Sequence, residues 1–411
     1  MRKKITASVA LSVGLVLIIS ITNAFLSYRI DRTAGTEFGN YFQYSGAIHI
    51  HTRYSDGGGT YERIGHIADS LGLHFIIPSD HNTVQPHLDG MGGIIGSTLI
   101  IPAVEISTND SHGHFLVLGD SIPLVPRVGI TSDSVFKDAR AKNAMTFLAH
   151  VHHPIDKLNW DNWEIGDFHG IELFNLDSNW RRTLSPFRLH RLLSAFLVYF
   201  VRDEVLNHLI TLPGKEMKAF DELNSKRKVV GIGSLDAHSR IRILKGNREK
   251  GTDGLIWRFP SYESNFNLVN TIIVTREPFD SSYNHDRQLL LHAIRQGNSY
   301  VGFSGLENAR GFLFTASSDT AEVIMGERMS FSESGEPILL TIAMPDSNDV
   351  SVQLIRNGSV FREFRNIGTV QVPVSEPGVY RVQAFQHRIM LPFFMKRSYP
   401  WILSNPIYLF N

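Results

Sequence analysis

The chain has 411 residues, a hydrophobic fraction of 43% and a formal net charge of zero, which fits a globular protein long enough for two domains. The balanced charge gives no bulk electrostatic case for binding nucleic acid, so no stable nucleic-acid complex is expected. The absence of cysteine excludes disulfides and thiolate metal sites, so any metal must be held by nitrogen and oxygen ligands.

Residues 1–28 begin with a basic stretch and continue with about twenty apolar residues. Such a segment is typical of an export signal or of an uncleaved membrane anchor helix, with its basic side in the cytoplasm. Both alternatives stay open, because Thr22-Asn23-Ala24 is only a fair cleavage site. We expect an exported protein that is membrane-anchored by this helix, or periplasmic or extracellular after cleavage.

Residues 44–305 alternate short apolar runs with helical patterns. The run 46–51 predicts a strand, and residues 60–73 predict an amphipathic helix whose apolar residues recur at helical spacing from Ile64 to Leu71. Strand-like and helical runs continue to alternate through the region. This order favours an α/β fold of parallel β/α units wound around one sheet or barrel.

Residues 306–411 have a different pattern, in which strand-like runs are separated by the turn-forming residues Pro, Asn-Gly and Pro-Gly. Asn357-Gly358, between two such runs, predicts a tight hairpin turn. We therefore expect a C-terminal all-β, sandwich-like domain. A packing or partner-binding module is the expected role, and the sequence names no protein partner.

Histidine is crowded into one part of the chain, because eleven of the eighteen histidines fall between His49 and His153. Side chains two apart on a strand share a face, so His49 and His51 are expected to converge, and Asp236 and His238 repeat the spacing. Polar residues that end strands form the active sites of β/α barrels. Imidazole and carboxylate together suit divalent Zn, Mn or Fe, so a convergent metal site is predicted.

The turn 55–59, which reads Ser-Asp-Gly-Gly-Gly, follows this first pair of histidines. Its unobstructed backbone amides could bind an anion, and a merely flexible turn fits equally well. Arg53 could hold an anionic group or be a solvated arginine, and Asp80 is expected to orient a neighbour through hydrogen bonds.

The motifs HIHTRYSDG, PSDHN, VEIST…HGHFLVLG, AHVHHP and GIGSLDAH, in this order, resemble the polymerase and histidinol phosphatase (PHP) superfamily. The resemblance covers roughly residues 46–300 and implies a distorted seven-stranded β/α barrel with two or three divalent metal ions. The runs EPGVYRVQAF and PWILSNPIYLF resemble the carbaryl-hydrolase-like branch of the same superfamily.

The resemblance also implies the metal ligands. It assigns His49, His51, Glu105 and Asp236 to the first metal, Glu105, His114 and a histidine of AHVHHP to the second, and Asp56, His81 and His238 to the third. From AHVHHP we predict His150 as the ligand because it ends the strand. His150 and His152 are expected to share a strand face, and His152 and His153 to contact either the ligands or the substrate.

This ligand set predicts a metal-dependent phosphoric ester hydrolase in which a metal-activated hydroxide attacks phosphorus. His152 is predicted as the acid for the leaving group, and Asp236 and Arg53 as further catalytic residues. The expected substrate is a small phosphate ester, a nucleotide or a short oligonucleotide. A carboxylic or carbamate ester hydrolase with the same metal site, and a non-catalytic metal-stabilised binding protein, are the alternatives.

Overall fold

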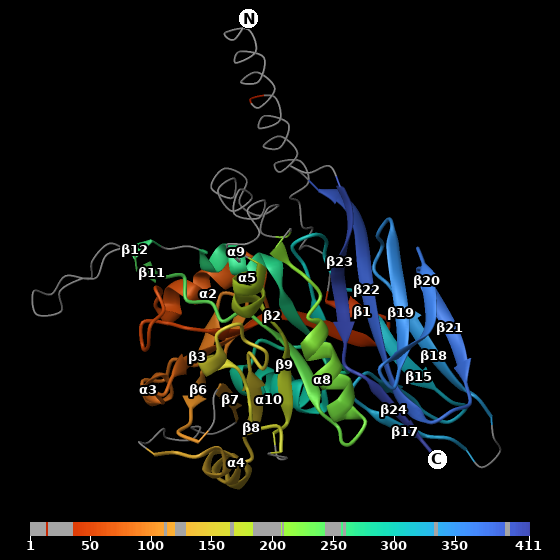
Figure 1. Cartoon of the computed structure of the whole chain (residues 1–411), viewed down its shortest axis with the longest axis horizontal. Coiled ribbons are helices and arrows are strands. Elements are labelled where there is room, and N and C mark those ends of the chain that lie inside the picture. Colours follow the sequence, from red (N-terminus) through yellow and green to blue (C-terminus); the bar gives the residue numbers. More distant parts are fainter. Residues whose placement is uncertain are drawn as a thin grey trace, which may run out of the picture.

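The computed structural model describes residues 14, 36–110, 113–119, 129–164, 168–183, 207, 209–242, 256–257, 260–332, 336–390 and 395–411. The expected signal or anchor, residues 1–28, lies outside this part of the chain except for Gly14. Within the described ranges, every helix is too short or too polar to cross a bilayer. The chain has a mixed α/β fold in which helices gather around one half and strands make up the other (Figure 1).

The strand β2 (Tyr41–Ile50) organises the first half of the fold. Its early residues pair antiparallel with β13 (Asn270–Thr275), and its later residues pair in parallel with β3 (Phe75–His81). The series continues from β3 through β6 (Ala103–Ser107), β7 (His114–Leu118), β8 (Met145–Ala149), β9 (Gly170–Asn175) and β10 (Val230–Ser234).

Every neighbouring pair from β2 to β10 is parallel except the two pairs made by β7, which is antiparallel to both β6 and β8. The expectation of parallel units throughout is therefore wrong for this strand. Only residues 108–113 separate β6 from β7, and a parallel crossover needs a dozen or more residues.

The described pairings do not establish a closed barrel. β10 returns towards β2 through one isolated parallel bridge, Ile50–Ala237, supported by backbone hydrogen bonds from Leu235 N–H to Ile48 and from His51 N–H to Ala237. The structure shows the seven-strand series and its order, and closure into the expected barrel stays a prediction.

Helices connect and cover these strands. The described ones are α2 (Tyr61–Ser70), α3 (Gln85–Leu88), α4 (Ser132–Ala141), the 3-10 helix Asp156–Leu158, α5 (Leu176–Thr183), α8 (Gly214–Asn224), α9 (Tyr262–Leu268) and α10 (Tyr283–Gln296). The helix predicted over 60–73 is confirmed as α2, which buries Ile64 and Ala68. It begins after Thr60, whose side chain accepts the Arg63 N–H as an N-cap.

The C-terminal half contains two sheets that share a core. One sheet contains β15 (Leu313–Ser317), β16 (Glu322–Ile324), β18 (Ile338–Ala343) and β21 (Thr369–Val374). The other contains β17 (Arg328–Ser330), β19 (Val350–Arg356), β20 (Ser359–Arg365), β22 (Gly378–Met390), β23 (Met395–Ser404) and β24 (Ile407–Phe410). Leu340 of the first sheet and Val352 and Val382 of the second are fully buried in one cluster, as in a sandwich.

The hairpin predicted at Asn357-Gly358 is confirmed between β19 and β20. Asn357 has φ 51° and Gly358 has φ 79°, so both central residues are left-handed. A two-residue type I′ turn requires this backbone, which Asn and Gly adopt at the lowest cost.

The two halves are joined by pairing and by side chains. β14 (Ser299–Gly302) pairs with β13 on one side and with β23 on the other. Arg381 of β22 donates to both carboxylate oxygens of Asp221 in α8 at 2.7 Å. The division into 44–305 and 306–411 therefore stays a prediction, since one sheet continues through both. Short strands complete the fold at β1 (Glu37–Phe38), β4 (Gly93–Ile95), β5 (Thr98–Ile100), β11 (Ile241–Arg242) and β12 (Ile256–Trp257).

Candidate metal centre

The nine side chains predicted as metal ligands come together at one edge of the strand series. Parallel strands deliver their last residues to this edge, and the antiparallel β7 delivers its first residue, His114, to the same edge. Three groups have ligand atoms that all lie within 4.8 Å of one another: His49, His51 and Asp236; His81, Glu105 and His114; and His51, Asp56, His81 and His238.

Glu105 stands between these groups with one oxygen facing each side. Its Oε2 lies 3.2 Å from His49 Nε2 and 3.4 Å from His51 Nε2. Its Oε1 lies 2.7 Å from His114 Nδ1 and 3.2 Å from His150 Nε2. A carboxylate in this position is suited to bridge two cations. Since His150 Nε2 is also 3.2 Å from His114 Nδ1, His150 is the histidine of AHVHHP that the structure brings into the cluster.

Buried atoms without hydrogen-bond partners show that the cluster fits a cation. His49 Nε2, His51 Nδ1 and Glu105 Oε2 are all buried and make no well-directed hydrogen bond in the described part of the chain, although His81 Nδ1 lies 2.8 Å from Glu105 Oε2. His49 Nδ1 is 2.5 Å from Glu172 Oε1, and donation of its proton there leaves the Nε2 lone pair facing the carboxylates. Buried polar atoms are rarely left unpaired, so a bound cation accounts for them.

The charges of the inner residues are strongly coupled. Burial opposes ionisation of Glu105 and Asp236, but neighbouring histidines hold the pKa of each carboxyl well below its usual range. Burial disfavours a charged His49, yet Glu105, Glu172 and Asp236 raise the pKa of His49 well above its ordinary value. The carboxylates around His49 therefore favour positive charge at this place, which a bound cation would supply.

The buried His51 and the more exposed pair of His238 and Asp56 show a similar balance of burial and charge. Burial and the charge of His238 lower the pKa of His51 to about 4, which leaves this imidazole neutral and able to coordinate. Burial opposes charge on both His238 and Asp56, but their hydrogen bond and mutual attraction raise the pKa of His238 to about 9 and lower that of Asp56 to about 2.

Left-handed backbone places three of the nine side chains. His49, His150 and Asp236 have φ of 65°, 35° and 53°, and conformations of this kind cost roughly 1–3 kcal/mol each for a residue with a Cβ. The pairing of β2 with β3 shifts register at the same place, between Ile48 and Ile50. Convergence therefore comes from strained strand ends, not from the simple alternation expected for His49 and His51. Strain concentrated on buried polar residues points to a functional site.

Glu172, a buried carboxylate on β9, was not predicted from the sequence. Its Oε1 accepts from His49 Nδ1, and its Oε2 accepts from the His150 N–H at 2.6 Å and from Asn175 Nδ2 at 2.8 Å. Glu172 thus fixes the ring of one cluster histidine and the backbone of another. A lone glutamate inside the apolar run GIELFN was the available signal.

The backbone amides of the glycine turn make hydrogen bonds within the protein. The Gly57 N–H donates to Thr52, and the amides of Gly58 and Gly59 reach the Tyr262 hydroxyl at 3.1 Å. A Cβ on Gly57 would lie 2.0 Å from the His51 carbonyl oxygen. These amides are engaged internally, so neither the anion-binding nor the flexible interpretation of the turn holds.

Asp80 acts as expected by fixing a neighbouring segment. It accepts from the Thr52 N–H and Thr52 Oγ1, both at 2.8 Å, and from Ser55 Oγ at 2.7 Å. These bonds hold the chain between His51 and Asp56 in place. The orienting role of Asp80 is therefore confirmed.

The other two catalytic candidates, His152 and Arg53, have their described contacts outside the cluster. The His152 ring contacts Trp163 with centroids 5.6 Å apart, and burial lowers its pKa. β8 ends at Ala149 and His150 is left-handed, so His150 and His152 do not share a strand face as expected. Among the described residues no hydrogen bond or ring contact links His152 or the exposed Arg53 to the nine side chains, so the acid role of His152 has no geometric support.

Arg181, also missed from the sequence, stands near the cluster on α5. Its Nε donates to Asp177, which lies 3.7 Å from His153 Nε2, and the His153 ring packs on His150 with centroids 5.5 Å apart. Burial opposes the charge, but Asp177 and then Asp236 of the cluster raise the pKa of Arg181. The Arg181 side chain is 52% exposed, so a guanidinium faces solvent within electrostatic reach of the site.

No protein-family model matches the sequence, and no curated protein matches it. Among solved structures, a two-domain protein from Bacteroides vulgatus containing a predicted PHP-like metal-dependent phosphoesterase matches with 14% identity and a TM-score of 0.41, over 90% of this chain and 97% of that one. A protein from Bifidobacterium adolescentis predicted to be a metal-dependent phosphoesterase matches with 13% identity and a TM-score of 0.30, over 47% of this chain and 87% of that one. An amidohydrolase from Chromobacterium violaceum, with bound sulfate and no metal, matches with 11% identity and a TM-score of 0.30, over 53% of this chain and 92% of that one. Because the TM-scores are below 0.5, these likenesses support no functional conclusion. The function is therefore inferred from the residues of the cluster.

Proposed function

We propose that the protein is a metal-dependent hydrolase that cleaves a phosphate ester, with two or three divalent ions of Mn, Zn or Fe held by the nine-residue cluster. The observation that carries this proposal is that buried imidazole and carboxylate groups converge with atoms left without hydrogen bonds. His49 Nε2 and Glu105 Oε2 lie 3.2 Å apart, and His51 Nδ1 is directed at Asp56. Nitrogen and oxygen donors in this mixture suit these metals.

The protein groups have distinct roles in this proposal. Bound divalent ions would lower the pKa of a water molecule and neutralise charge that develops on the phosphoryl oxygens. Glu105 would contact two ions through its two oxygens, and Glu172 would keep the His49 Nε2 lone pair directed into the site. Asp56, with its side chain 55% exposed, marks the side from which substrate would approach.

Arg181 favours an anionic substrate over a neutral ester. Its Nε donates to Asp177, its side chain is 52% exposed, and Asp236 of the cluster is near enough to raise its pKa. A planar guanidinium matches the oxygens of a phosphate, and a neutral carboxylic or carbamate ester has no charge for it to pair. A small phosphate ester or nucleotide is therefore the proposed substrate class.

The wider assignments are also proposals. Membership of the PHP superfamily and of its carbaryl-hydrolase-like branch, a distorted seven-stranded barrel, and export by residues 1–28 all rest on the sequence motifs. Cell fractionation of the full-length protein, with and without residues 1–28, tests the proposed location. Its appearance in the cytoplasm in both forms would contradict export.

Substrate specificity is the test of the proposed activity. The protein is stripped with chelator, reloaded with Mn or Zn, and assayed on phosphate monoesters, phosphate diesters and carboxylic esters of the same alcohol. The proposal expects metal-dependent release of the alcohol from one of the phosphate esters. A preference for the carboxylic ester would contradict phosphate specificity, and inactivity on every ester after full metal loading would contradict catalysis.

A further inference from the structure

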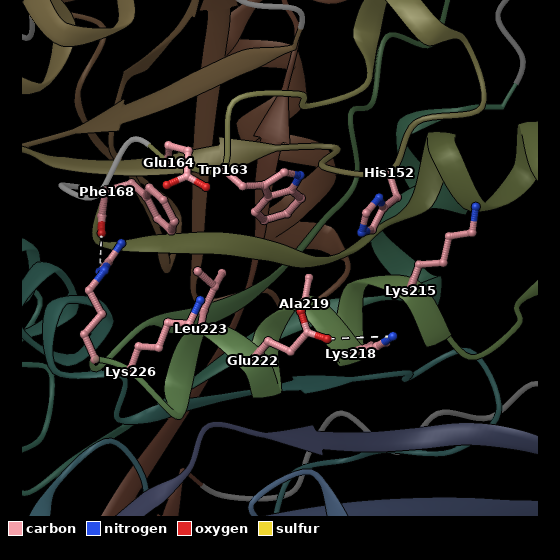
Figure 2. A pocket seen from close by; sticks show the side chains of 11 residues that line it. His152, Trp163, Glu164, Phe168, Lys215, Lys218, Ala219, Glu222, Leu223 and Lys226 are labelled. Atoms are coloured by element: carbon pink, nitrogen blue, oxygen red, sulfur yellow. Dashed lines mark hydrogen bonds and ion pairs between the residues drawn. The ribbon is translucent and has the colours of Figure 1, made fainter.

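A cavity of about 570 Å³ lies between α8 and the segment that carries His152, Trp163 and Phe168 (Figure 2). His152 and Lys215 stand at one end of it, and Phe168 and Lys226 stand at the other. Small-molecule sites have volumes of roughly 300–1,000 Å³, so the cavity is large enough for an organic ligand. None of the nine cluster residues lines it.

The cavity carries an excess of positive charge. Its charged side chains are those of Lys215, Lys218, Lys226, Arg227, Glu164 and Glu222, four cations against two acids, a net of +2. Lys218 pairs with Glu222 at 3.8 Å, while Lys215 and Lys226 have no ion-pair partner within the described ranges. This charge favours a ligand with at least two negative charges.

The same cavity has planar and apolar surfaces. The rings of Trp163 and His152 are partly exposed and lie 5.6 Å apart between centroids, whereas Phe168 is 1% exposed and is covered by Arg227. Leu223 of α8 adds an apolar side chain to the lining. Such surfaces suit a planar ring and offer little to a small inorganic anion.

Ion pairs from other elements hold both walls in position. Arg182 of α5 pairs with Glu216 of α8 and donates to the His152 carbonyl oxygen at 2.9 Å. On the far side of α8, Arg381 of β22 donates to both oxygens of Asp221 at 2.7 Å. The cavity is therefore formed before any ligand binds, which lowers the entropic cost of binding.

We propose that this cavity is a binding site for an organic anion that joins a planar ring to at least two negative charges, the chemistry of a nucleotide. The site is separate from the metal cluster, and the proposal holds whether or not the cluster hydrolyses a phosphate ester.

Calorimetry on the metal-free, full-length protein in excess EDTA tests the site without a contribution from cluster metals. AMP, adenosine and inorganic phosphate are the probes, since they carry the ring and the charge together or singly. AMP is expected to bind about tenfold or more tightly than either of the other two, a difference of about 1.4 kcal/mol or more. Phosphate binding as tightly as AMP, or AMP not binding at millimolar concentration, would overturn the proposal.

Exposed lysines provide variants that keep the fold. The double variant Lys215→Ala and Lys226→Ala is expected to weaken AMP binding by about tenfold, because charge-assisted hydrogen bonds are lost. Lys137→Ala is the matched control, since Lys137 is 75% exposed on α4, away from the cavity, and should leave AMP affinity unchanged. Equal affinity of the double variant and the wild type would overturn the assignment of this cavity.

Discussion

The inner wall and the outer rim of the cluster differ in how they are built. On the inner wall His49, His51 and Glu105 are at most 1% exposed and leave atoms without hydrogen-bond partners. At the rim His238 is 29% exposed and Asp56 is 55% exposed, and these two groups neutralise each other. The inner wall therefore needs a cation to be satisfied, whereas the rim can be satisfied by its own ion pair and water.

This contrast ranks the expected ion sites. Removing a cation from the inner wall leaves buried carboxylates without the positive charge of the metal, which is costly in a medium of low dielectric. Removing one from the rim exposes groups that water can solvate. Inner sites should therefore bind metal most tightly, and the rim site should be the first to empty.

Glu105→Gln should have the largest effect. The amide cannot bridge two cations, so hydrolysis should fall to the uncatalysed background and the bound metal should drop by more than one ion per chain. Activity assays and metal analysis of the purified variant check this. Glu277→Gln, a surface change with a side chain 72% exposed, is the control and should match the wild type. Full metal content in the Glu105 variant would refute the bridging role.

Glu172→Gln should have the second largest effect, although Glu172 itself is not expected to bind metal. Loss of a group that orients a ligand typically lowers metal affinity about 10- to 100-fold, and His49 loses its charged partner here. Competition with a chromophoric chelator measures the tightest site. An unchanged affinity would show that the Glu172 contact to His49 is only structural.

Arg181→Ala should raise KM for phosphate esters about 10- to 100-fold while kcat changes less, since hydrogen bonds to charged groups are worth about 1.5–3 kcal/mol. Asp177→Asn, which replaces the charged partner of the Arg181 Nε by a neutral amide and so holds the guanidinium less firmly, should give a smaller rise in KM. Steady-state kinetics with an anionic ester and a neutral ester of one alcohol separate the effects. Equal losses for both substrates would remove Arg181 from anion binding.

Asp56→Asn should lower metal affinity only at the rim site. One cation should leave or bind about tenfold more weakly, with the inner ions retained, because the variant keeps every inner ligand. Metal titration followed by calorimetry resolves the separate sites. Loss of all metal in this variant would break the distinction between wall and rim.

The pH dependence of the metal-free protein should show the smallest effect. The pKa of His238 is raised from 6.5 to about 9, so its stabilising contribution is complete below pH 6.5 and is lost as pH rises through about 9. The Tm of the chelated protein should therefore decline over this range, and His238→Asn should flatten the decline. A Tm of the wild-type protein that stays constant from pH 6.5 to 9, and changes only below pH 6.5, would contradict the prediction.

The cluster could be predicted from the sequence because its histidines and acids sit in ordered motifs at the ends of apolar runs. Its geometry could not. The left-handed turns at His49, His150 and Asp236 and the antiparallel course of β7 depend on tertiary pairing, which overrides local alternation.

The supporting residues were missed for a related reason. Glu172 lies alone inside an apolar run, and Arg181 lies on the polar helix α5, whose local pattern is that of a solvated helix. Their roles come from neighbours more than twenty residues away, such as His150 for Glu172. The predicted roles of His152 and Arg53 rested on closeness in sequence, which did not place either side chain in the cluster.

Anomalous X-ray scattering from crystals grown with Mn or Zn would locate the metal ions. Two or three peaks are expected inside the nine-residue cluster, one of them on each side of Glu105, with the rim peak weakest. Ligand distances near those of known sites, about 2.0–2.2 Å for nitrogen and oxygen, should accompany them. Crystals saturated with metal that show no peak between His49, Glu105 and Asp236 would contradict the account.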